Sequence, residues 1–398
     1  MRSLKWIIIA LVIIAIPVVQ LVRPVSHLTV QADVAPDQTI SGHQPAINWP
    51  SEGEAALDVV GVGELGQSGT QTSVPIASVT KVMTAYLVLK KHPLQEGQQG
   101  PSITVTKADY QTYLDDKAKG ESCLKVQTGE KLTERQALEG LLLPSGNNVA
   151  TMLANWCDGS VSKFVKEMNQ TAKSMGMTHT QYVDASGYDP GSSSTAVDQA
   201  NLFGVAMQNA TFKEVVGEAQ ATLPVAGIVY NVNADLGHGG IIGGKTGSTS
   251  EAGGCLVFAT QKQVNNQDVM IVGAILGQKN AESILTKVLN VGVTLSTEAR
   301  AAVHSVTVVQ NAEPLAQVTA PWMDEQTLQA SAPVQMIGWD GIHVETKMAT
   351  DPTLKNHVAA GAAVGTMTVT VGNQTKKIPL KTVTAIEGPS YLWRLKRI

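Results

Sequence analysis

The spacing of apolar and polar residues divides the chain into regions of different character. Residues 6–22 form one uncharged apolar run, whereas residues 23–49 show no sustained period. From about 130 to 220, apolar residues recur at three- and four-residue intervals, a spacing typical of amphipathic helices. Strand-like segments follow, among them "GIIGGKTGS", "GGCLVFATQ" and "DVMIVGAILG", and the chain stays β-rich after about residue 303. The pattern predicts an apolar N-terminal segment, a mixed domain and an all-β domain.

The mixed domain, expected over residues 50–299, combines strands with a helical block. A strand near "AALDVVGVGEL" precedes the helices, and the later strands and a helix at about 280–297 follow them. This order predicts an α/β (α+β) fold: an antiparallel sheet whose first and last strands are neighbours, with helices packed against it. The all-β domain is expected over 303–387, with Gly372-Asn373 as a hairpin turn. Two other stretches are a linker or extended entry strand at 33–49 and a short basic and aromatic tail at 388–398.

The apolar run at the amino terminus predicts export. Arg2 and Lys5 precede it, and residues 6–22 are long enough to cross a bilayer as a helix. Basic residues before the run favour a cytoplasmic amino terminus, so the remaining chain is delivered outside. Residues 1–32 are interpreted as a signal peptide or a membrane anchor. Both stay open, because "VQA" ending at Ala32 resembles a cleavage site while the run exceeds an ordinary signal sequence in length.

Composition and charge restrict the kinds of molecule that the protein is expected to bind. The 398 residues include 29 basic and 33 acidic side chains and carry a formal charge of -4, so bulk charge predicts no nucleic-acid partner. The three cysteines lack CxxC or His-rich spacing, so no metal site and no cofactor are expected. Buried free thiols are the favoured interpretation of Cys123, Cys157 and Cys255.

Ser78 and Lys81 carry the first chemical signal, within "PIASVTKVMTA". Positions i and i+3 share a face of a helix, so the Lys81 amine can reach the Ser78 hydroxyl. Apolar neighbours would bury the amine and lower its pKa, which would let a neutral Lys81 accept the serine's proton. A serine hydroxyl becomes a good nucleophile only when a neighbouring base does this. Alone, the pattern is weak, because Ser-x-x-Lys recurs by chance.

Two further stretches strengthen the signal. "LLLPSGNNVA" places Ser145 and Asn147 just before a helix, where they can point into a cleft, although Ser145 alone also fits a helix N-cap. "GGKTGST" places Lys245, Thr246 and Gly247 on a probable strand, where the glycine permits close approach of a ligand backbone. The alternative is a glycine-rich strand end with an exposed lysine. In this order, the three patterns are those of penicillin-binding proteins and class A β-lactamases.

The chain resembles the low-molecular-mass penicillin-binding proteins that act as serine-type D-Ala-D-Ala carboxypeptidases. The resemblance covers roughly residues 50 to 297 and includes "PIASVTKVMTAYLVL", "LTERQALEGLLLPSGNNVATMLA" and "FVKEMNQTAKSMGMTHTQYVDASGYD". It implies a penicillin-binding/β-lactamase-like fold, to which the β-rich tail adds the small C-terminal domain of many relatives. It also implies removal of the terminal D-alanine from peptidoglycan stem pentapeptides, covalent inhibition by β-lactams, and a location at the outer face of the bacterial cytoplasmic membrane or in the cell wall or periplasm.

The resemblance further implies roles for four catalytic residues. Ser78 would attack the peptide carbonyl between the two D-alanines and form an acyl-enzyme, and Lys81 would take its proton. Ser145 would relay a proton to the leaving D-alanine. Asn147 would hold the substrate amide and Lys81 by hydrogen bonds.

Four more residues are expected to bind the substrate. Lys245 would tune the site electrostatically, and Gly247 would let the substrate backbone come close. Backbone N–H groups of Ser78 and Ser248 would form the oxyanion hole. The hydroxyl groups of Thr246 and Ser248 would meet the terminal carboxylate.

The chain departs from the family pattern at two points. Asn148 stands where an aspartate commonly follows the second motif, and no arginine occurs between Arg135 and Arg300 to clamp the substrate carboxylate. Lys279 could substitute as a point charge, although a solvated lysine at a strand end is the simpler interpretation.

Two other functions stay open beside the carboxypeptidase. A non-catalytic β-lactam or peptidoglycan sensor would keep the cleft without turnover. A class A β-lactamase would need a glutamate in a Glu-x-x-Leu-Asn context, which the sequence lacks. The sequence also leaves open whether water or an amine resolves the acyl-enzyme.

Overall fold

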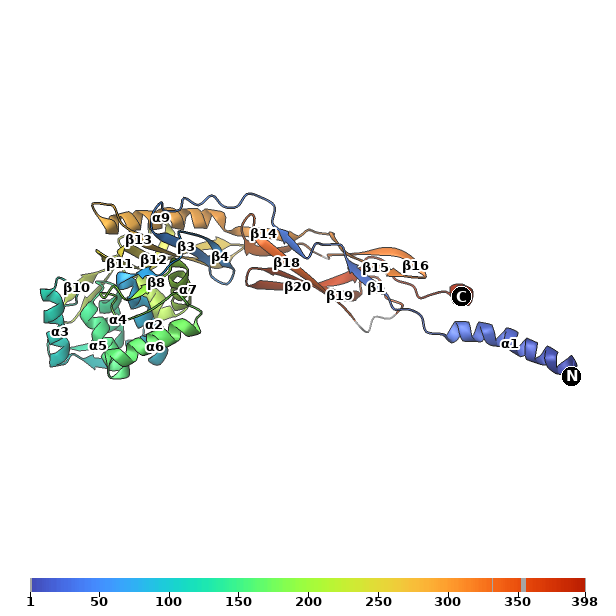
Figure 1. The fold of residues 1–398 in the computed structure, drawn as a ribbon, viewed down its shortest axis with the longest axis horizontal. Coiled ribbons are helices and arrows are strands. Elements are labelled where there is room, and N and C mark those ends of the chain that lie inside the picture. Colours follow the sequence, from blue (N-terminus) through green and yellow to red (C-terminus); the bar gives the residue numbers. More distant parts are fainter. Residues whose placement is uncertain (1, 331, 352–355, 398) are drawn as a thin grey trace. The chain divides into compact units, whose positions relative to one another are not determined.

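The structure, a computed structural model, describes residues 2–330, 332–351 and 356–397. It divides into two compact units, drawn in Figure 1. The central unit comprises residues 46–303, and in the terminal unit the residues up to 45 join those from 304 onward. The change of sequence pattern near residue 303 coincides with this division.

A five-stranded antiparallel sheet forms the middle of the central unit. Its order is β11-β12-β13-β3-β4, from the strands β3 (Glu54–Val59), β4 (Gly63–Ser68), β11 (Ile241–Thr249), β12 (Gly253–Val264) and β13 (Gln267–Gln278). The early strand β3 pairs with the last strand β13, as Ile271 opposite Val59 illustrates. The predicted antiparallel sheet with neighbouring first and last strands is therefore confirmed.

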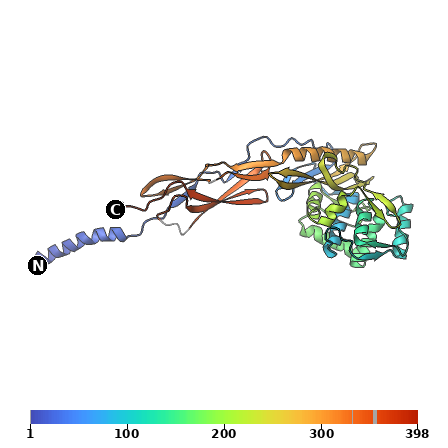
Figure 2. The same ribbon diagram turned by 180° about the vertical axis from the view of Figure 1, so that it is seen from behind.

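Helices cover both faces of this sheet. Val272 of β13 lies against Gly204 in α7 (Ala196–Ala206), and Ile275 lies against Gly292 in α9 (Ile284–Ala302). Residues of opposite parity on a strand point to opposite faces, so α7 and α9 lie on different sides of the sheet. Figures 1 and 2 show the same arrangement, with the helical block on the face away from α9.

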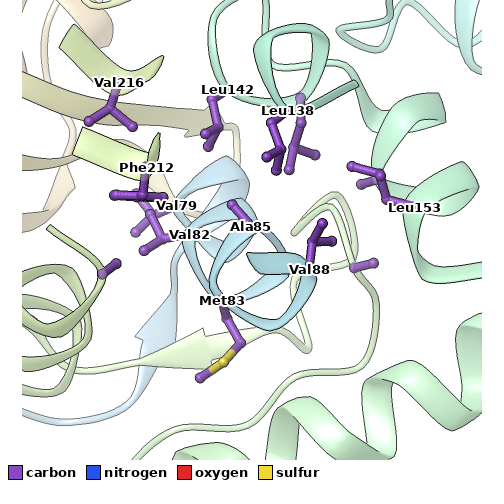
Figure 3. Packing of buried hydrophobic residues seen from close by; sticks show 14 of the residues in the cluster. Val79, Val82, Met83, Ala85, Val88, Leu138, Leu142, Leu153, Phe212 and Val216 are labelled. Carbon is purple, nitrogen blue, oxygen red and sulfur yellow. The ribbon is translucent and has the colours of Figure 1, made fainter. Parts of the chain in front are cut away.

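The helical block surrounds one almost completely buried helix, α2 (Lys81–Lys91). Around it lie α4 (Glu134–Leu142), α5 (Asn147–Asp158), α6 (Val161–Ser174), α7 and α8 (Ala210–Gly217), while α3 (Lys107–Ala118) packs against α5. Figure 3 shows Val82 and Ala85 of α2 among Leu138, Leu153 and Phe212 from three of these neighbours. A helix that is apolar on every side must be buried, and Lys81 at its first position is buried with it.

Short strand pairs and turns connect these elements. They are β5 (Val74–Pro75) with β8 (Ser193–Ser194), β6 (Ser102–Thr104) with β7 (Lys131–Thr133), β9 (Gln220–Leu223) with β10 (Gly227–Tyr230), and the 3-10 turns η1 (Ala77–Thr80) and η2 (His238–Gly240).

The terminal unit is built on β-structure, as the sequence predicts. Its seven-stranded sheet has the order β1-β15-β16-β20-β19-β18-β2, and β14 pairs separately with β17. The strands are β1 (Thr29–Ala32), β2 (Asp37–Thr39), β14 (His304–Val309), β15 (Pro314–Ala320), β16 (Met323–Gln329), β17 (Val334–Gly338), β18 (His343–Thr350), β19 (Ala363–Val371) and β20 (Gln374–Thr382). Val371 pairs with Gln374, so Gly372-Asn373 is the expected hairpin turn.

The N-terminal segment contributes both edges of this sheet. β1 pairs with β15, and β2 pairs with β18 at the opposite edge. Of the two interpretations of residues 33–49, the linker is therefore wrong for β2, and the extended entry strand describes these residues correctly. The segment's short polar strands are stabilised by backbone pairing with the sheet rather than by any alternation of their own.

Within the terminal unit, the C-terminal tail contacts the end of the N-terminal helix. Residues Arg2–Val22 form α1, and its stretch Leu4–Val22 has a mean hydropathy of 2.5, which suffices by length and composition for a membrane span. The tail expected at 388–398 contains a short helix, α10 (Tyr391–Lys396). Arg394 Nη1 donates to the carbonyl of Leu21, 3.1 Å away, so the tail satisfies backbone oxygens at the end of α1.

Candidate active site

The turn η1 and the first residue of α2 bring Ser78 and Lys81 together. Ala77 enters this turn with φ +47°. Gly187 packs so closely against it that a Cβ atom at residue 187 would lie 1.8 Å from the Ala77 carbonyl oxygen. Lys81 Nζ lies 2.8 Å from Ser78 Oγ. Ser78 lines an open cleft of about 420 Å³, while Lys81 is fully buried behind it.

Two acceptors also hold the Lys81 amine. Lys81 Nζ donates to Asn147 Oδ1 at 2.6 Å and to the Ser186 carbonyl at 2.9 Å. Burial, reinforced by the positive charge of Lys245, holds the pKa of Lys81 well below its usual value. The carboxylates of the surrounding acidic residues oppose this effect in part.

Lys245 and Ser145 form a second lysine–serine pair. Lys245 Nζ donates to Ser145 Oγ at 3.0 Å and to the Thr246 carbonyl at 2.8 Å. Ser145 has φ +64°, and the N-cap of α5 is Gly146, so the N-cap alternative for Ser145 is wrong. Lys245 is only 1% exposed, which also excludes the exposed-lysine alternative. Burial lowers the pKa of Lys245 to about 7.

Gly247 lets β11 pass directly along the turn that carries Ser78. A Cβ atom at residue 247 would lie 2.9 Å from the Ser78 backbone nitrogen and 3.0 Å from the Ile76 carbonyl oxygen. The close approach here is thus made by the chain's own backbone, whereas the sequence suggested a ligand. The next residue, Ser248, lines the cleft, and Thr246 on its other side is buried.

Asp184 is a functional residue that sequence reasoning missed. Its carboxylate accepts from Ser186 Oγ at 2.7 Å and from the backbone nitrogens of Gly187 and Tyr188, each at 2.9 Å. These bonds shape the loop that presents the Ser186 carbonyl to Lys81. The available signal was "DASG", since aspartate before glycine favours a turn in which the carboxylate binds backbone N–H groups.

Glu121 was missed as well. It follows α3 in the polar segment "AKGESC", and its Oε2 accepts from Asn147 Nδ2 at 2.7 Å. Glu121, Asn147 and Ser78 all line the cleft. No local pattern singles out this glutamate, because its partner lies 26 residues away.

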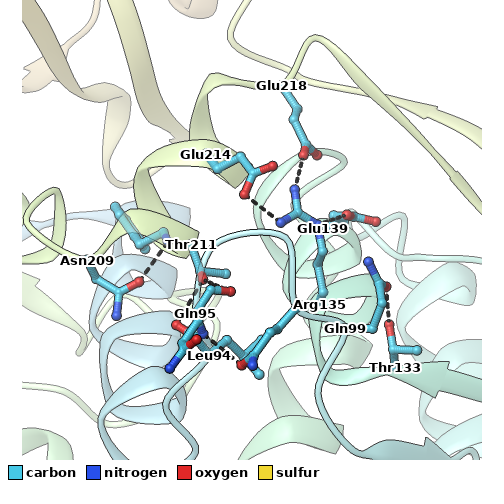
Figure 4. A network of polar contacts seen from close by, with 12 residues as sticks. Leu94, Gln95, Gln99, Thr133, Arg135, Glu139, Asn209, Thr211, Glu214 and Glu218 are labelled. Atoms are coloured by element: carbon cyan, nitrogen blue, oxygen red, sulfur yellow. Dashed lines mark hydrogen bonds and ion pairs between the residues drawn. The ribbon is translucent and has the colours of Figure 1, made fainter.

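One of the two departures from the family pattern, Asn148, has a structural explanation. Asn148 Nδ2 donates to the Leu124 carbonyl at 3.0 Å and its Oδ1 accepts from the Leu124 nitrogen at 2.8 Å, a pairing that an ionised aspartate could not complete. Arg135 is engaged by three glutamates, as Figure 4 shows. Among the described residues that line the cleft, Lys119 is the only cation, and Lys279 is not one of them.

The cysteines differ in exposure. Cys255 is buried, but Cys123 and Cys157 are partly exposed, and the three thiols are free. The expectation of burial therefore holds for Cys255 alone.

The chain matches known proteins over its central unit. Residues 65–280 match the family model described as D-alanyl-D-alanine carboxypeptidase. The D-alanyl-D-alanine carboxypeptidase DacB2 of Mycobacterium tuberculosis is 33% identical over 228 residues, which cover 56% of this chain and 72% of that protein. A D-alanyl-D-alanine carboxypeptidase of Streptomyces sp. K15 is also 33% identical, over 55% of this chain and 78% of its own length.

Two solved structures have similar folds. The Streptomyces K15 DD-transpeptidase superposes with a TM-score of 0.55 at 27% identity, covering 65% of this chain and 100% of that one. Penicillin binding protein 5 from Haemophilus influenzae covers 87% of this chain and 100% of its own, with a TM-score of 0.61. At 19% identity, the second likeness concerns the fold alone.

Proposed function

Because this chain belongs to the D-alanyl-D-alanine carboxypeptidase family, we propose that Ser78 is its nucleophile and Lys81 its general base. The protein is a serine-type D-Ala-D-Ala carboxypeptidase, a penicillin-binding hydrolase of the bacterial cell wall. Its substrate class is peptidoglycan peptide ending in D-Ala-D-Ala, and β-lactams bind in the same site. The family places the enzyme in the periplasm or cell wall.

The hydrogen bonds of Lys81 are the observation that carries the assignment. Asn147 Oδ1 and the Ser186 carbonyl can only accept, so each takes one N–H bond of the amine. The third contact of the amine is Ser78 Oγ, 2.8 Å away. A neutral amine has only two hydrogens, so its lone pair is left for Ser78. Lys81 can then take the hydroxyl proton as Ser78 Oγ attacks the substrate carbonyl.

Ser145 and Lys245 supply the proton that the leaving D-alanine needs in the acylation step. As the ester between Ser78 and the substrate forms, the peptide bond to the terminal D-alanine breaks and its nitrogen needs a proton. Ser145 Oγ, hydrogen-bonded to Lys245, donates this proton and is replenished from the lysine. A pKa of about 7 lets Lys245 give up and regain a proton near neutral pH.

The end of β11 is proposed to bind the substrate. The backbone N–H groups of Ser78 and Ser248 form the oxyanion hole, and Gly247 lets β11 approach the nucleophile closely enough to bring them together. Thr246 and Ser248 hydroxyls receive the terminal carboxylate. Lys245, buried on the same strand, tunes the site electrostatically when it is protonated.

The deciding experiment is turnover by the full-length protein in detergent on a D-Ala-D-Ala pentapeptide, with and without an amine acceptor. We expect repeated release of D-alanine with water alone, and no release from Ser78→Ala. Intact-mass spectrometry should place penicillin on Ser78 of the wild type and nowhere on Ser78→Ala. Penicillin labelling without repeated D-alanine release would favour the sensor. The Streptomyces K15 relative bears both carboxypeptidase and transpeptidase names, which makes the acceptor comparison informative.

We also propose that the N-terminal helix is retained as a membrane anchor at the outer face of the cytoplasmic membrane. Cleavage after Ala32 would remove the whole of β1, which pairs with β15 through four residues from Thr29 to Ala32. Leu28, just before it, is buried. Arg397 adds donors to the carbonyls of Gln20 and Pro24 at the end of α1, each 3.0 Å away. The measured mass of membrane-purified protein tests this proposal: a chain that starts at Asp33 would contradict it.

A further inference from the structure

Glu121 is held firmly at the wall of the cleft. Its backbone nitrogen donates to the Asp116 carbonyl at 3.0 Å, which fixes it to the end of α3. Its side chain is 4% exposed, although its segment lines the open cleft, and Lys119 Nζ lies 3.6 Å from its Oε1. The other carboxylate oxygen, Oε2, accepts from Asn147 Nδ2 at 2.7 Å. The contact is therefore a short, charge-assisted hydrogen bond shielded from water.

This contact decides which way the Asn147 amide points. An ionised carboxylate only accepts, so the NH₂ group of Asn147 must face Glu121 and its Oδ1 must face Lys81. If the amide were turned over, its NH₂ group would point at Lys81 and claim the amine's lone pair. That lone pair is the one Ser78 needs. The second hydrogen of Asn147 Nδ2 remains available for a substrate carbonyl in the cleft.

We infer that Glu121 is a positioning residue, which locks the Asn147 amide and thereby directs the Lys81 lone pair to Ser78. The inference rests on the proposed roles of Ser78 and Lys81. Glu121 touches neither the substrate's reacting atoms nor the nucleophile, and it acts through Asn147.

The negative charge of Glu121 should also affect the pH dependence of acylation. The charged groups that act on Lys81 are Lys245 from β11, Asp184 from the loop between α6 and β8, and Asp116 and Glu121 from α3 and its end. Glu121 favours the protonated amine, so its neutralisation lowers the pKa of Lys81 further. Acylation is lost at low pH when Lys81 becomes protonated. Removal of the Glu121 charge therefore moves the acid limb of the pH profile to lower pH.

The test is the rate of acylation by penicillin between pH 5 and pH 9, for full-length wild type, Glu121→Gln and Asp115→Asn. Asp115 is the matched control, because it is an exposed acid on α3 whose carboxylate accepts a hydrogen bond from Gln111. For Glu121→Gln we expect about a tenfold loss near neutral pH, since hydrogen bonds to charged groups are worth roughly that factor or more. The acid limb of the Glu121→Gln profile should shift to lower pH, while Asp115→Asn should keep the wild-type profile.

A double-substitution cycle separates positioning from a general structural effect. In an Asn147→Ala background, Glu121→Gln should cause no further loss of rate, because the amide through which it acts is absent. Glu121→Asp serves as a second variant: it should keep the acid limb and lose rate, since the charge remains but the reach is shorter. Wild-type rate and an unmoved limb in Glu121→Gln would overturn the inference. Labelling of Ser78→Ala would instead overturn the proposed nucleophile, so the two failures are distinguishable.

Discussion

Two buried cations of the central unit are set up for opposite purposes. Lys81 makes its hydrogen bonds to neutral partners, a hydroxyl, an amide oxygen and a backbone carbonyl. Arg135, only 6% exposed, has a carboxylate at each guanidinium nitrogen: Glu139 at Nε, Glu214 at Nη1 and Glu218 at Nη2 (Figure 4). One cation lacks a paired charge and the other has three.

The difference appears in the ease with which each group loses its proton. Burial and the nearby Lys245 hold the pKa of Lys81 well below its usual value. The hydrogen bonds that Arg135 donates to Glu214 and to Glu218 raise the pKa of Arg135. Among the described residues, no carboxylate touches the Lys81 amine, and the acids farther away offset its burial only in part. The cluster that joins α4 to α8 instead places three carboxylates against the Arg135 guanidinium, which keeps it charged.

The largest expected effect comes from replacing Lys81 with arginine, which cannot lose its positive charge. In Lys81→Arg the charge remains but no proton can be accepted, because the guanidinium does not deprotonate in proteins. Acylation by penicillin should fall by about 10²–10⁴-fold, the usual contribution of a general base. The measurement is the rate of adduct formation by mass spectrometry, with the melting temperature as a check on folding. An acylation rate near that of the wild type would show that Lys81 is not the base.

Removal of Arg135 should lower the free energy of unfolding and leave the acylation rate unchanged. In Arg135→Leu, Glu139 and Glu218 stay partly buried without their partner, and breaking such a cluster costs about 3–5 kcal/mol of unfolding free energy. Thermal and urea unfolding of the purified protein would measure this loss. Below its melting temperature the folded variant should still acylate at about the wild-type rate, since the contacts of Ser78 and Lys81 are untouched. Loss of acylation in a protein of unchanged stability would reverse the proposed division of roles.

Glu134 extends the comparison to a buried acid. It is fully buried, and within the described part of the chain neither carboxylate oxygen has a hydrogen-bond partner. Burial raises the pKa of Glu134 from 4.5 to about 7. The folded state therefore binds the proton more tightly than the unfolded state, and the stability from this group falls as pH rises from about 4.5 to about 7. At about 1.4 kcal/mol per pKa unit, the total loss is on the order of 3 kcal/mol.

Glu134→Gln should remove this pH dependence. The variant should be more stable than the wild type above pH 7 and closer to it near pH 4.5, because glutamine stays neutral throughout. Melting temperatures of both proteins at a series of pH values from 4.5 to 8 give the difference directly. A wild-type advantage that grows with pH would mean that Glu134 is ionised and paired in the folded protein.

Much of this comparison could be predicted from the sequence, because it depends on local spacing. The i, i+3 separation places Ser78 near Lys81, and the apolar character of residues 82–89 buries the amine. The contacts that complete the site come from distant segments: the Ser186 carbonyl and the Glu121 carboxylate are set by loop packing that no local period encodes. The same reason hides β2, whose three residues "DQT" form a strand only by pairing with β18.

The smallest expected effect comes from removing one of the three glutamates that pair with Arg135. Glu214 is the most exposed of the three glutamates around Arg135, with 40% of its side chain accessible, against 11% for Glu139 and 24% for Glu218. Water already screens the Glu214 pair, so Glu214→Gln should cost less than about 1 kcal/mol in urea unfolding. Glu139→Gln, the matched control on α4, should cost more, because its bond to Arg135 is better shielded. Equal losses for the two variants would show that burial does not govern this cluster, and the contrast with Lys81 would then rest on the number of carboxylates alone.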